Sequence, residues 1–194
     1  MRLPEYHLTL PAWMADVAAD EVVIPDVVER MRFVVGLAAR NVAEGTGGPF
    51  GAAVFVRDTG RLVAPGVNRV VSTRCSIAHA EIVAIAMAGQ VLGSFDLGAG
   101  GEMELVSSVE PCAMCLGAIP WSGVASLVCG ARDEDARAVG FDEGDKPRDW
   151  IADLVDRDIE VHLDVLREEA ARVLYDYALA GGIIYNGRVH HRHA

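Results

Sequence analysis

The chain has 194 residues, 52% of them apolar and 23% charged, which fits one globular domain large enough to bury a core. No apolar run approaches the length of a membrane span, and four cysteines do not suggest a disulfide framework. The net charge of −11 would repel a polyanion, so the composition disfavours a nucleic-acid substrate and favours a small molecule.

Residues 1–24 mix prolines, acids and scattered apolar residues, and we expect an N-terminal arm packed on the surface of a domain over 25–194. A short helix is possible around Trp13 to Asp20. Pro4, Glu5 and Pro11 stand where a secretory signal peptide needs basic and then apolar residues, so we expect a cytoplasmic protein.

The first clear element is a helix that begins at Pro25-Asp26 and carries apolar residues at helical spacing as far as Val42. Two strands follow, over 51–56 and 61–67, with a turn between them that predicts an antiparallel hairpin. Residues 68–77 are expected to be a loop.

Helices and strands then alternate to the end of the domain. The pattern predicts helices over 78–92, 112–120, 133–138, 150–154 and 165–180, and strands over 103–108, 125–129 and 159–162. This alternation indicates an α/β fold, a sheet flanked by helices. A tail begins at about residue 182, and its basic end, Arg188 to His193, is expected to be disordered.

Two short segments carry the chemistry, His79-Ala80-Glu81 and Pro111 to Cys115. One imidazole and two thiols match a catalytic zinc site, which uses three protein ligands and leaves the fourth position for water. Cys112 and Cys115 share one face of a helix start, where the positive helix end favours the thiolate. His79 and Glu81 can share a site only at a helix start, which the predicted boundary near residue 78 allows.

The expected ligands are His79, Cys112 and Cys115, with one zinc ion per chain. Two thiolates neutralise Zn²⁺, so a bound water can be activated, and Glu81 can take its proton as general base and then return it as acid. The alternative is a structural zinc site in a non-catalytic binding module, with Cys75 as fourth ligand, but it leaves Glu81 unexplained.

These two motifs, in this order, resemble those of the cytidine/deoxycytidylate deaminase superfamily, in which a zinc-activated water displaces ammonia from an amino-heterocycle. The resemblance implies a three-layer α/β/α fold with a central mixed five-stranded sheet, and a homodimer. The flanking segments are most similar to guanine deaminases, namely Pro49 to Ala52, the second zinc segment as far as Trp121, and Gly140 to Glu143.

The guanine deaminase resemblance also implies roles for further residues. It implies that Glu143 joins Glu81 as a catalytic residue and that Asn68 contacts the base. It places Phe50, Ala80 and Trp121 at the substrate, and Tyr185 in a C-terminal lid that can close over the partner's active site. The N-terminal arm and residues 144–158 are longer than the family pattern, and Arg74 to Ile77 replace its usual Asp-Pro-Thr.

The leading hypothesis is therefore deamination of a free amino-purine or a related amino-triazine, above all guanine to xanthine plus ammonia. A nucleoside deaminase acting on guanosine or cytidine is the first alternative. A tRNA adenosine deaminase is a weaker one, because the acidic chain shows no basic stripe.

Overall fold

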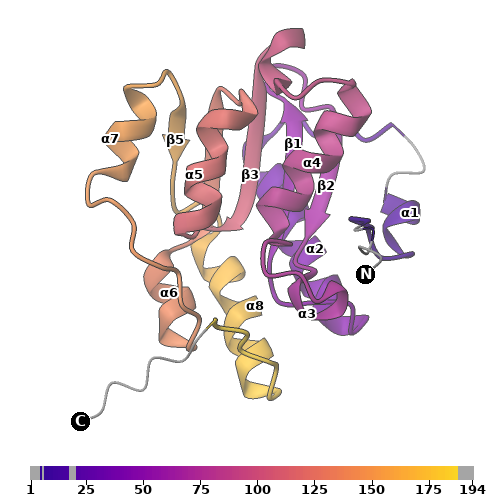
Figure 1. Cartoon of the computed structure of the whole chain (residues 1–194), viewed down its shortest axis with the longest axis vertical. Coiled ribbons are helices and arrows are strands. Elements are labelled where there is room, and N and C mark those ends of the chain that lie inside the picture. Colours follow the sequence, from indigo (N-terminus) through magenta and orange to yellow (C-terminus); the bar gives the residue numbers. More distant parts are fainter. Residues whose placement is uncertain (1–4, 6, 18–20, 188–194) are drawn as a thin grey trace.

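The computed structural model describes residues 5, 7–17 and 21–187, which form a single mixed sheet covered by helices on both faces (Figure 1). Its five strands lie in the order β2-β1-β3-β4-β5. The strands are β1 (Gly51–Val56), β2 (Leu62–Val67), β3 (Met103–Val109), β4 (Ser126–Ala131) and β5 (Glu160–His162).

Strand direction divides the sheet into two parts. β1 pairs antiparallel with both β2 and β3, so the predicted hairpin is confirmed. β3, β4 and β5 run parallel. Parallel neighbours need a crossover connection, and helices supply it here, so the carboxyl ends of β3 and β4 meet at one edge of the sheet.

One face of the sheet is covered by α4 (Ala80–Leu92), α5 (Ala113–Ser122) and α7 (Trp150–Val155). Figure 1 shows α4 and α5 side by side in front of β3, β1 and β2. The core on this face joins Ala84 of α4 and Ile119 of α5 to Val54 and Leu105 of the sheet, all fully buried. Small alanines on α4 let that helix approach the strands closely.

The opposite face is covered by α2 (Val27–Ala43) and α8 (Arg167–Leu179). Asp26 caps α2 by accepting hydrogen bonds from the backbone of Val28 and Glu29. Met31 and Leu174 meet Phe55 and Val106, the strand residues that alternate with those of the first core. The expected three-layer α/β/α fold with a mixed five-stranded sheet is confirmed.

The remaining elements are short: α1 (Met14–Val17), α3 (Val70–Thr73), a 3₁₀ turn (Leu97–Gly100) and α6 (Asp133–Ala138). The expected loop over 68–77 was therefore wrong in part, because α3 forms there. Trp13 and Met14 pack with Leu37 and Val67, which holds the arm against the domain. The predicted helix end at 18–20 and the basic tail lie outside the described residues. No described helix is both long and apolar enough to cross a membrane.

Candidate active site

Two helix starts converge beyond the carboxyl end of β3. His79 is the N-cap of α4 and Cys112 is the N-cap of α5, and both have extended backbones, with ψ of 156° and 169°. An N-cap residue does not yet have helical backbone angles, so the direction of its side chain is not set by the 3.6-residue period of the helix. His79 can therefore face the same site as Glu81, although only one residue separates them. The sequence-based expectation of a helix start here is confirmed.

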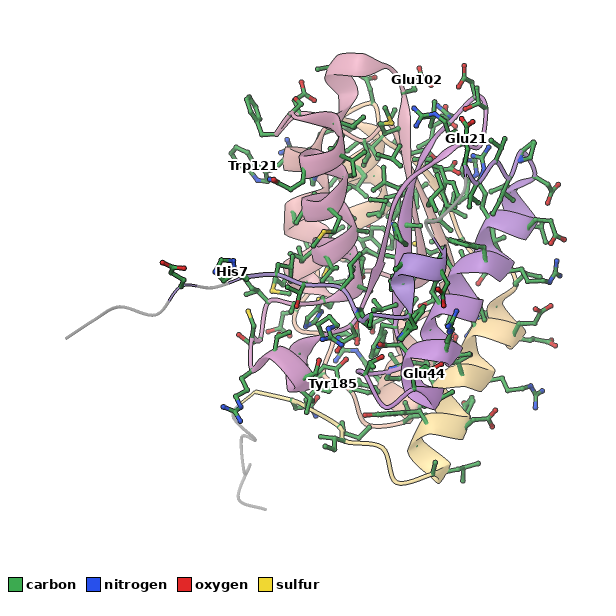
Figure 2. All side chains as sticks on the ribbon, turned by 90° about the vertical axis from the view of Figure 1, so that its right-hand side faces the viewer. His7, Glu21, Glu44, Glu102, Trp121 and Tyr185 are labelled. Atoms are coloured by element: carbon green, nitrogen blue, oxygen red, sulfur yellow. The ribbon has the colours of Figure 1, made fainter. Side chains whose placement is uncertain are left out.

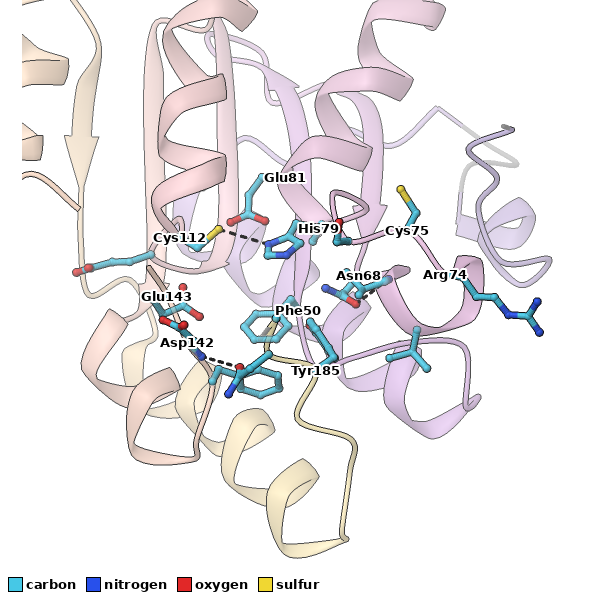
Figure 3. A pocket seen from close by; sticks show the side chains of 18 residues that line it. Phe50, Asn68, Arg74, Cys75, His79, Glu81, Cys112, Asp142, Glu143 and Tyr185 are labelled. Carbon is cyan, nitrogen blue, oxygen red and sulfur yellow. Dashed lines mark hydrogen bonds between the residues drawn. The ribbon is translucent and has the colours of Figure 1, made fainter. Parts of the chain in front are cut away.

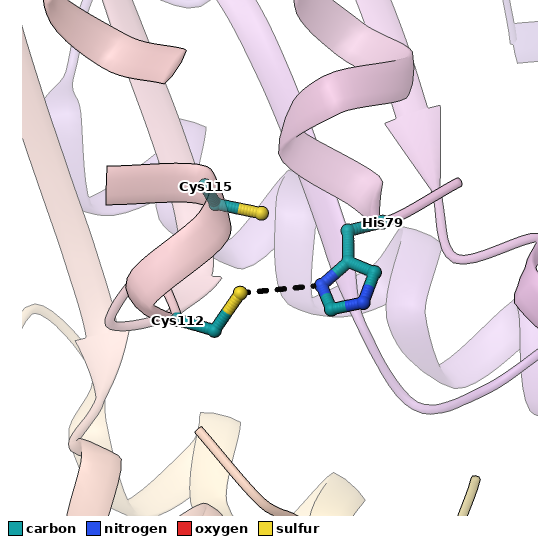
Figure 4. A group of neighbouring side chains, drawn as sticks. All are labelled: His79, Cys112 and Cys115. Atoms are coloured by element: carbon teal, nitrogen blue, oxygen red, sulfur yellow. Dashed lines mark hydrogen bonds between the residues drawn. The ribbon is translucent and has the colours of Figure 1, made fainter. Parts of the chain in front are cut away.

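His79, Cys112 and Cys115 form the one group among the described residues whose ligand atoms could hold a metal, all within 4.8 Å of one another (Figure 4). We call it the metal group. The Cys112 sulfur lies 3.4 Å from Nδ1 of His79. Tetrahedral zinc with ordinary bond lengths would separate such a sulfur and nitrogen by about 3.6 Å, so the residues fit zinc.

The pKa values of the three residues in the metal group are shifted in different directions. A hydrogen bond from Cys115, opposed by burial and supported by His79, lowers the pKa of Cys112 to about 4. The hydrogen bond to Cys112 and burial raise the pKa of Cys115. Burial disfavours charge on His79, but Cys112 and Glu81 outweigh it and raise its pKa. A bound dication would lower all three pKa values, because it stabilises the deprotonated ligands.

Glu81 lies beside the metal group in the first turn of α4. Its side chain is buried, and burial together with the charge of Cys112 raises its pKa, while His79 acts in the opposite direction. A carboxylate with a raised pKa is a better proton acceptor than an exposed one. These properties suit a carboxyl group to proton transfer, the role that the sequence predicts for Glu81.

A pocket of about 440 Å³ opens over this site (Figure 3). His79, Glu81 and Cys112 line it on one side. Apart from Ala80, the other lining residues come from five places in the sequence, namely Phe50, 68–76, Glu110, 141–143 and 185–187. Figure 3 shows Glu81 and Cys112 across the pocket from Phe50 and Tyr185, with Asn68 and Glu143 at either flank.

The profile of the cytidine and deoxycytidylate deaminase zinc-binding region matches residues 27–131, which hold both halves of the site. The chain belongs to this deaminase family. A solved guanine deaminase from Nitrosomonas europaea is 46% identical, with a TM-score of 0.87, over 90% of this chain and 97% of that one.

Two further relatives are similar to this chain. A protein solved in complex with 2,6-diaminopurine is 47% identical, with a TM-score of 0.88, over 93% of this chain and 96% of that one. The guanine deaminase of Bacillus subtilis is 44% identical over 109 residues, which cover 56% of this chain and 67% of that protein. The recognition as a member of this superfamily is confirmed.

The deaminase pocket includes most of the residues expected at the substrate. Asn68, at the end of β2, is buried and accepts a hydrogen bond from the backbone of Val70 through Oδ1. No hydrogen bond among the described residues engages its Nδ2. Phe50 packs edge-on against Phe141 at 4.9 Å, and Ala80 also lines the pocket.

Glu143 lies in the loop after α6 and lines the deaminase pocket. Burial, with the nearby charges of Cys112 and Glu81, raises its pKa to about 8. Its carbonyl accepts a hydrogen bond from Ala113, which ties the loop to the first turn of α5. The loop therefore brings a second buried carboxyl group to the site.

Tyr185 closes the pocket from the C-terminal segment of the same chain. Its ring meets Phe141 at 5.3 Å and Phe50 at 6.5 Å. Burial raises its pKa, and its hydroxyl oxygen is buried without a hydrogen-bond partner among the described residues. Asn186 fastens the segment, because its side chain pairs with the backbone of Gly140 and Asp142.

The expectation that Trp121 lines the pocket was wrong for this chain. Trp121 is 86% exposed and lies near the end of α5, about 13 Å along the helix from Cys112. The family resemblance gave its position in the sequence but not the direction of its side chain.

Cys75, the fourth ligand of the alternative structural zinc site, lines the pocket at half-exposure and is not part of the metal group. Figure 3 places it on the far side of His79 from Cys112.

Sequence reasoning missed two residues at the site. Glu110 is buried, lines the pocket and binds Lys146 and Arg132 at 3.3 Å each. Its place directly before Pro111 was a usable signal. Asn186 had no signal, because its partners lie more than forty residues away in the sequence.

Proposed function

We propose that this protein is a guanine deaminase, which converts guanine and water to xanthine and ammonia with one zinc ion per chain. The observation that carries the proposal is the composition of the pocket. A metal group and a buried Glu81 face Asn68, Glu143 and two aromatic rings. Two of the similar structures support a purine ligand, since one is a guanine deaminase and the other holds 2,6-diaminopurine.

The proton transfers fall to the chain's own carboxyl groups. When bound by the metal group, zinc supplies Lewis acidity that makes water a stronger acid. Glu81 accepts a proton from that water, whose oxygen bonds to the amino-bearing carbon of the purine, and delivers the proton to the neighbouring ring nitrogen. It then passes the remaining proton of the added hydroxyl group to the amino group, and the carbon–nitrogen bond breaks to release ammonia. Glu143 recognises the amino-bearing edge of guanine by hydrogen bonding and assists the transfer of the last proton to the amino group.

The other residues hold the base in place. Nδ2 of Asn68 is available to donate a hydrogen bond to a ring or carbonyl acceptor, while Phe50 and Tyr185 enclose the planar ring. The backbone amide of Ala80 orients the water or the base. We call Phe50, Asn68, Glu143 and Tyr185 the recognition wall. These residues surround a planar base on several sides, and the proposed activity belongs to purine metabolism.

The decisive experiment measures ammonia released from guanine, guanosine, cytosine, cytidine, adenine and an amino-triazine by zinc-loaded protein. We expect guanine to give the highest kcat/KM. Glu81→Gln should retain zinc but lose about 10²–10⁴-fold in kcat, the usual loss for a general base. Glu102→Gln is the matched control, because this exposed glutamate lies at the opposite end of the molecule from Tyr185 (Figure 2).

The outcomes separate the alternatives. Release from guanosine or cytidine above that from guanine would favour a nucleoside deaminase. Activity on tRNA alone would favour the tRNA enzyme, against the net charge of −11. If no substrate released ammonia, and if Glu81→Gln bound zinc and ligands as the wild type does, the non-catalytic zinc-binding module would be favoured. The cytoplasmic location and the division at residue 24 stay predictions.

We also propose that the chain forms a homodimer through α4 and α5. Phe95 and Trp121, at the ends of these helices, are 94% and 86% exposed, and Val91 is 64% exposed. The segments after the two helices touch, since a Cβ on Gly98 would lie 2.7 Å from the carbonyl oxygen of Gly123. Exposed large apolar side chains gathered in this way are typical of an interface.

Light scattering tests the dimer directly. We expect a mass of two chains for the wild type and of one chain for Trp121→Glu, with Tyr175→Glu, another exposed aromatic on α8, as control. A monomeric wild type would contradict the proposal. Exchange of the lid between subunits is a separate question, and here Tyr185 lines the pocket of its own chain.

A further inference from the structure

A second buried asparagine stands behind the recognition wall. Asn41, on α2, is 0% exposed and does not line the pocket. Its Nδ2 donates two hydrogen bonds of 2.9 Å, one to the carbonyl oxygen of Gly48 and one to that of Asn68. One side chain therefore binds the turn before β1 and the residue after β2.

Both partners of Asn41 support residues that enclose the ligand. Asn68 is itself in the recognition wall. Gly48 lies directly under Tyr185, because a Cβ at this glycine would be 2.8 Å from the tyrosine hydroxyl and ring. A shift of either carbonyl would thus move a residue that contacts the purine.

The turn at Gly47 packs tightly against Asn41 and Asn68. A Cβ on Gly47 would lie 1.9 Å from the carbonyl oxygen of Asn68 and 2.6 Å from Nδ2 of Asn41. Non-bonded Cβ atoms do not approach other heavy atoms so closely, so the close packing of the turn against Asn41 and Asn68 requires glycine at position 47.

The N-terminal arm sets the orientation of the Asn41 amide. Nε1 of Trp13 donates to the hydroxyl oxygen of Thr46 at 3.1 Å, and that hydroxyl donates to Oδ1 of Asn41 at 2.7 Å. An indole nitrogen is a donor only, so it fills one acceptor position of the hydroxyl. The hydrogen of the hydroxyl goes to Oδ1 of Asn41, which lies closer than the other acceptor in reach, the backbone carbonyl oxygen of Asn41 at 3.3 Å. This order of donors leaves the amide nitrogen of Asn41 facing the two carbonyl oxygens.

We propose that Asn41 is a positioning residue for purine binding and that the N-terminal arm orients it through Trp13 and Thr46. The side chain touches neither the substrate nor the metal group, and it holds two parts of the recognition wall at a fixed separation. The effect on purine affinity rests on the proposed guanine deaminase function, whereas the effect on the geometry of the pocket does not.

The test replaces the donor without changing the shape. Asn41→Asp places an oxygen against two carbonyl oxygens. We expect KM for guanine to rise at least about tenfold, since two buried carbonyl oxygens lose their hydrogen-bond donor. The zinc content should be unchanged and kcat should fall less than KM rises. Amide hydrogen exchange in 46–50 and 68–70 should accelerate in the same variant, with or without substrate.

Variants of Thr46 and Trp13 test the hydrogen bonds that orient Asn41, and we expect smaller effects from them. Thr46→Val removes the hydroxyl and should raise KM about threefold, while Thr46→Ser keeps the hydroxyl and should match the wild type. Trp13→Phe should act as Thr46→Val does, with the ring still packed in place. If Asn41→Asp gives no soluble protein, Thr46→Val against Thr46→Ser decides the matter.

A KM within twofold of the wild type, with unchanged exchange in both segments, would overturn the proposal. So would a lower melting temperature with an unchanged KM, because that pattern marks a residue that supports only the fold. A wild type without guanine turnover would refute the proposed function instead, and the exchange measurements would then decide the role of Asn41.

Discussion

The two sides of the pocket are built in different ways. The metal group and Glu81 come from two helix starts and occupy short stretches, 79–81 and 112–115. The recognition wall is gathered from four segments between residues 50 and 185, held by loops, ring contacts and the C-terminal segment. Helix starts packed on a sheet hold the reacting groups rigidly, whereas the wall depends on contacts between distant segments.

Removal of one ligand tests the rigid side and should have the largest effect. Cys112→Ala should lose zinc and reduce guanine turnover to background, because two protein ligands remain of the three that zinc requires. Metal content and ammonia release check it together.

The controls for Cys112→Ala are the cysteines outside the metal group. Cys75→Ser and Cys129→Ala should both retain zinc. Zinc loss in Cys75→Ser would contradict the catalytic site and favour a structural one with four protein ligands.

Asn68→Ala tests the recognition wall and should have the next largest effect. The purine then loses a hydrogen bond in a buried site, at a cost of about 1–3 kcal/mol, or about 5- to 150-fold in kcat/KM. Zinc content should not change. Steady-state kinetics measure the change, with Ser72→Ala, at an exposed position on α3, as control. Equal kcat/KM values for the two variants would refute a role of Asn68 in purine binding.

Tyr185→Phe should separate stability from affinity. The buried hydroxyl has no partner among the described residues, so its removal should stabilise the free protein by up to about 1 kcal/mol. The same change should raise KM for guanine a few fold, because the hydroxyl, unpartnered among the described residues, is no longer available to hydrogen-bond a bound ligand. Thermal melting and steady-state kinetics on one sample test both expectations, the higher stability and the higher KM. A fall in both stability and KM would contradict the assignment.

Asp133→Asn should show the smallest effect, on the support of the loop that carries Glu143. Lys146 lies 2.8 Å from Asp133 and 3.3 Å from Glu110. Burial disfavours the charge of Asp133, but hydrogen bonds from Arg137 and Lys146 outweigh it and lower its pKa. The ion pairs therefore stabilise the fold above the ordinary pKa of an aspartate, and this contribution disappears as the pH falls through the lowered value.

We expect Asp133→Asn to cost about 1 kcal/mol of unfolding free energy at pH 7 and almost nothing near pH 2. Urea denaturation at both pH values measures the difference. A cost that is equal at the two values would show that the ion pairs do not contribute.

The sequence was most informative where chemistry is local. The zinc ligands follow from residue types and spacing, and helix starts at His79 and Cys112 follow from the apolar pattern and from Pro111. The sheet and its helices also follow from periodicity, while their three-layer arrangement came from the family resemblance.

The missed features depend on tertiary contacts. The exposed position of Trp121 is set by the direction of α5 relative to the pocket. The pairing of Asn186 with Gly140, and that of Asn41 with Asn68, join residues far apart in the sequence, and no local pattern distinguishes such asparagines from ordinary surface ones.

The missing side chain at Gly48 leaves room for the ring of Tyr185, which occupies the space that any other residue at this position would fill. A bulkier residue there would force the C-terminal segment outward and widen the pocket. The closure of the pocket by Tyr185 therefore depends on a glycine that lies well away from the reacting groups.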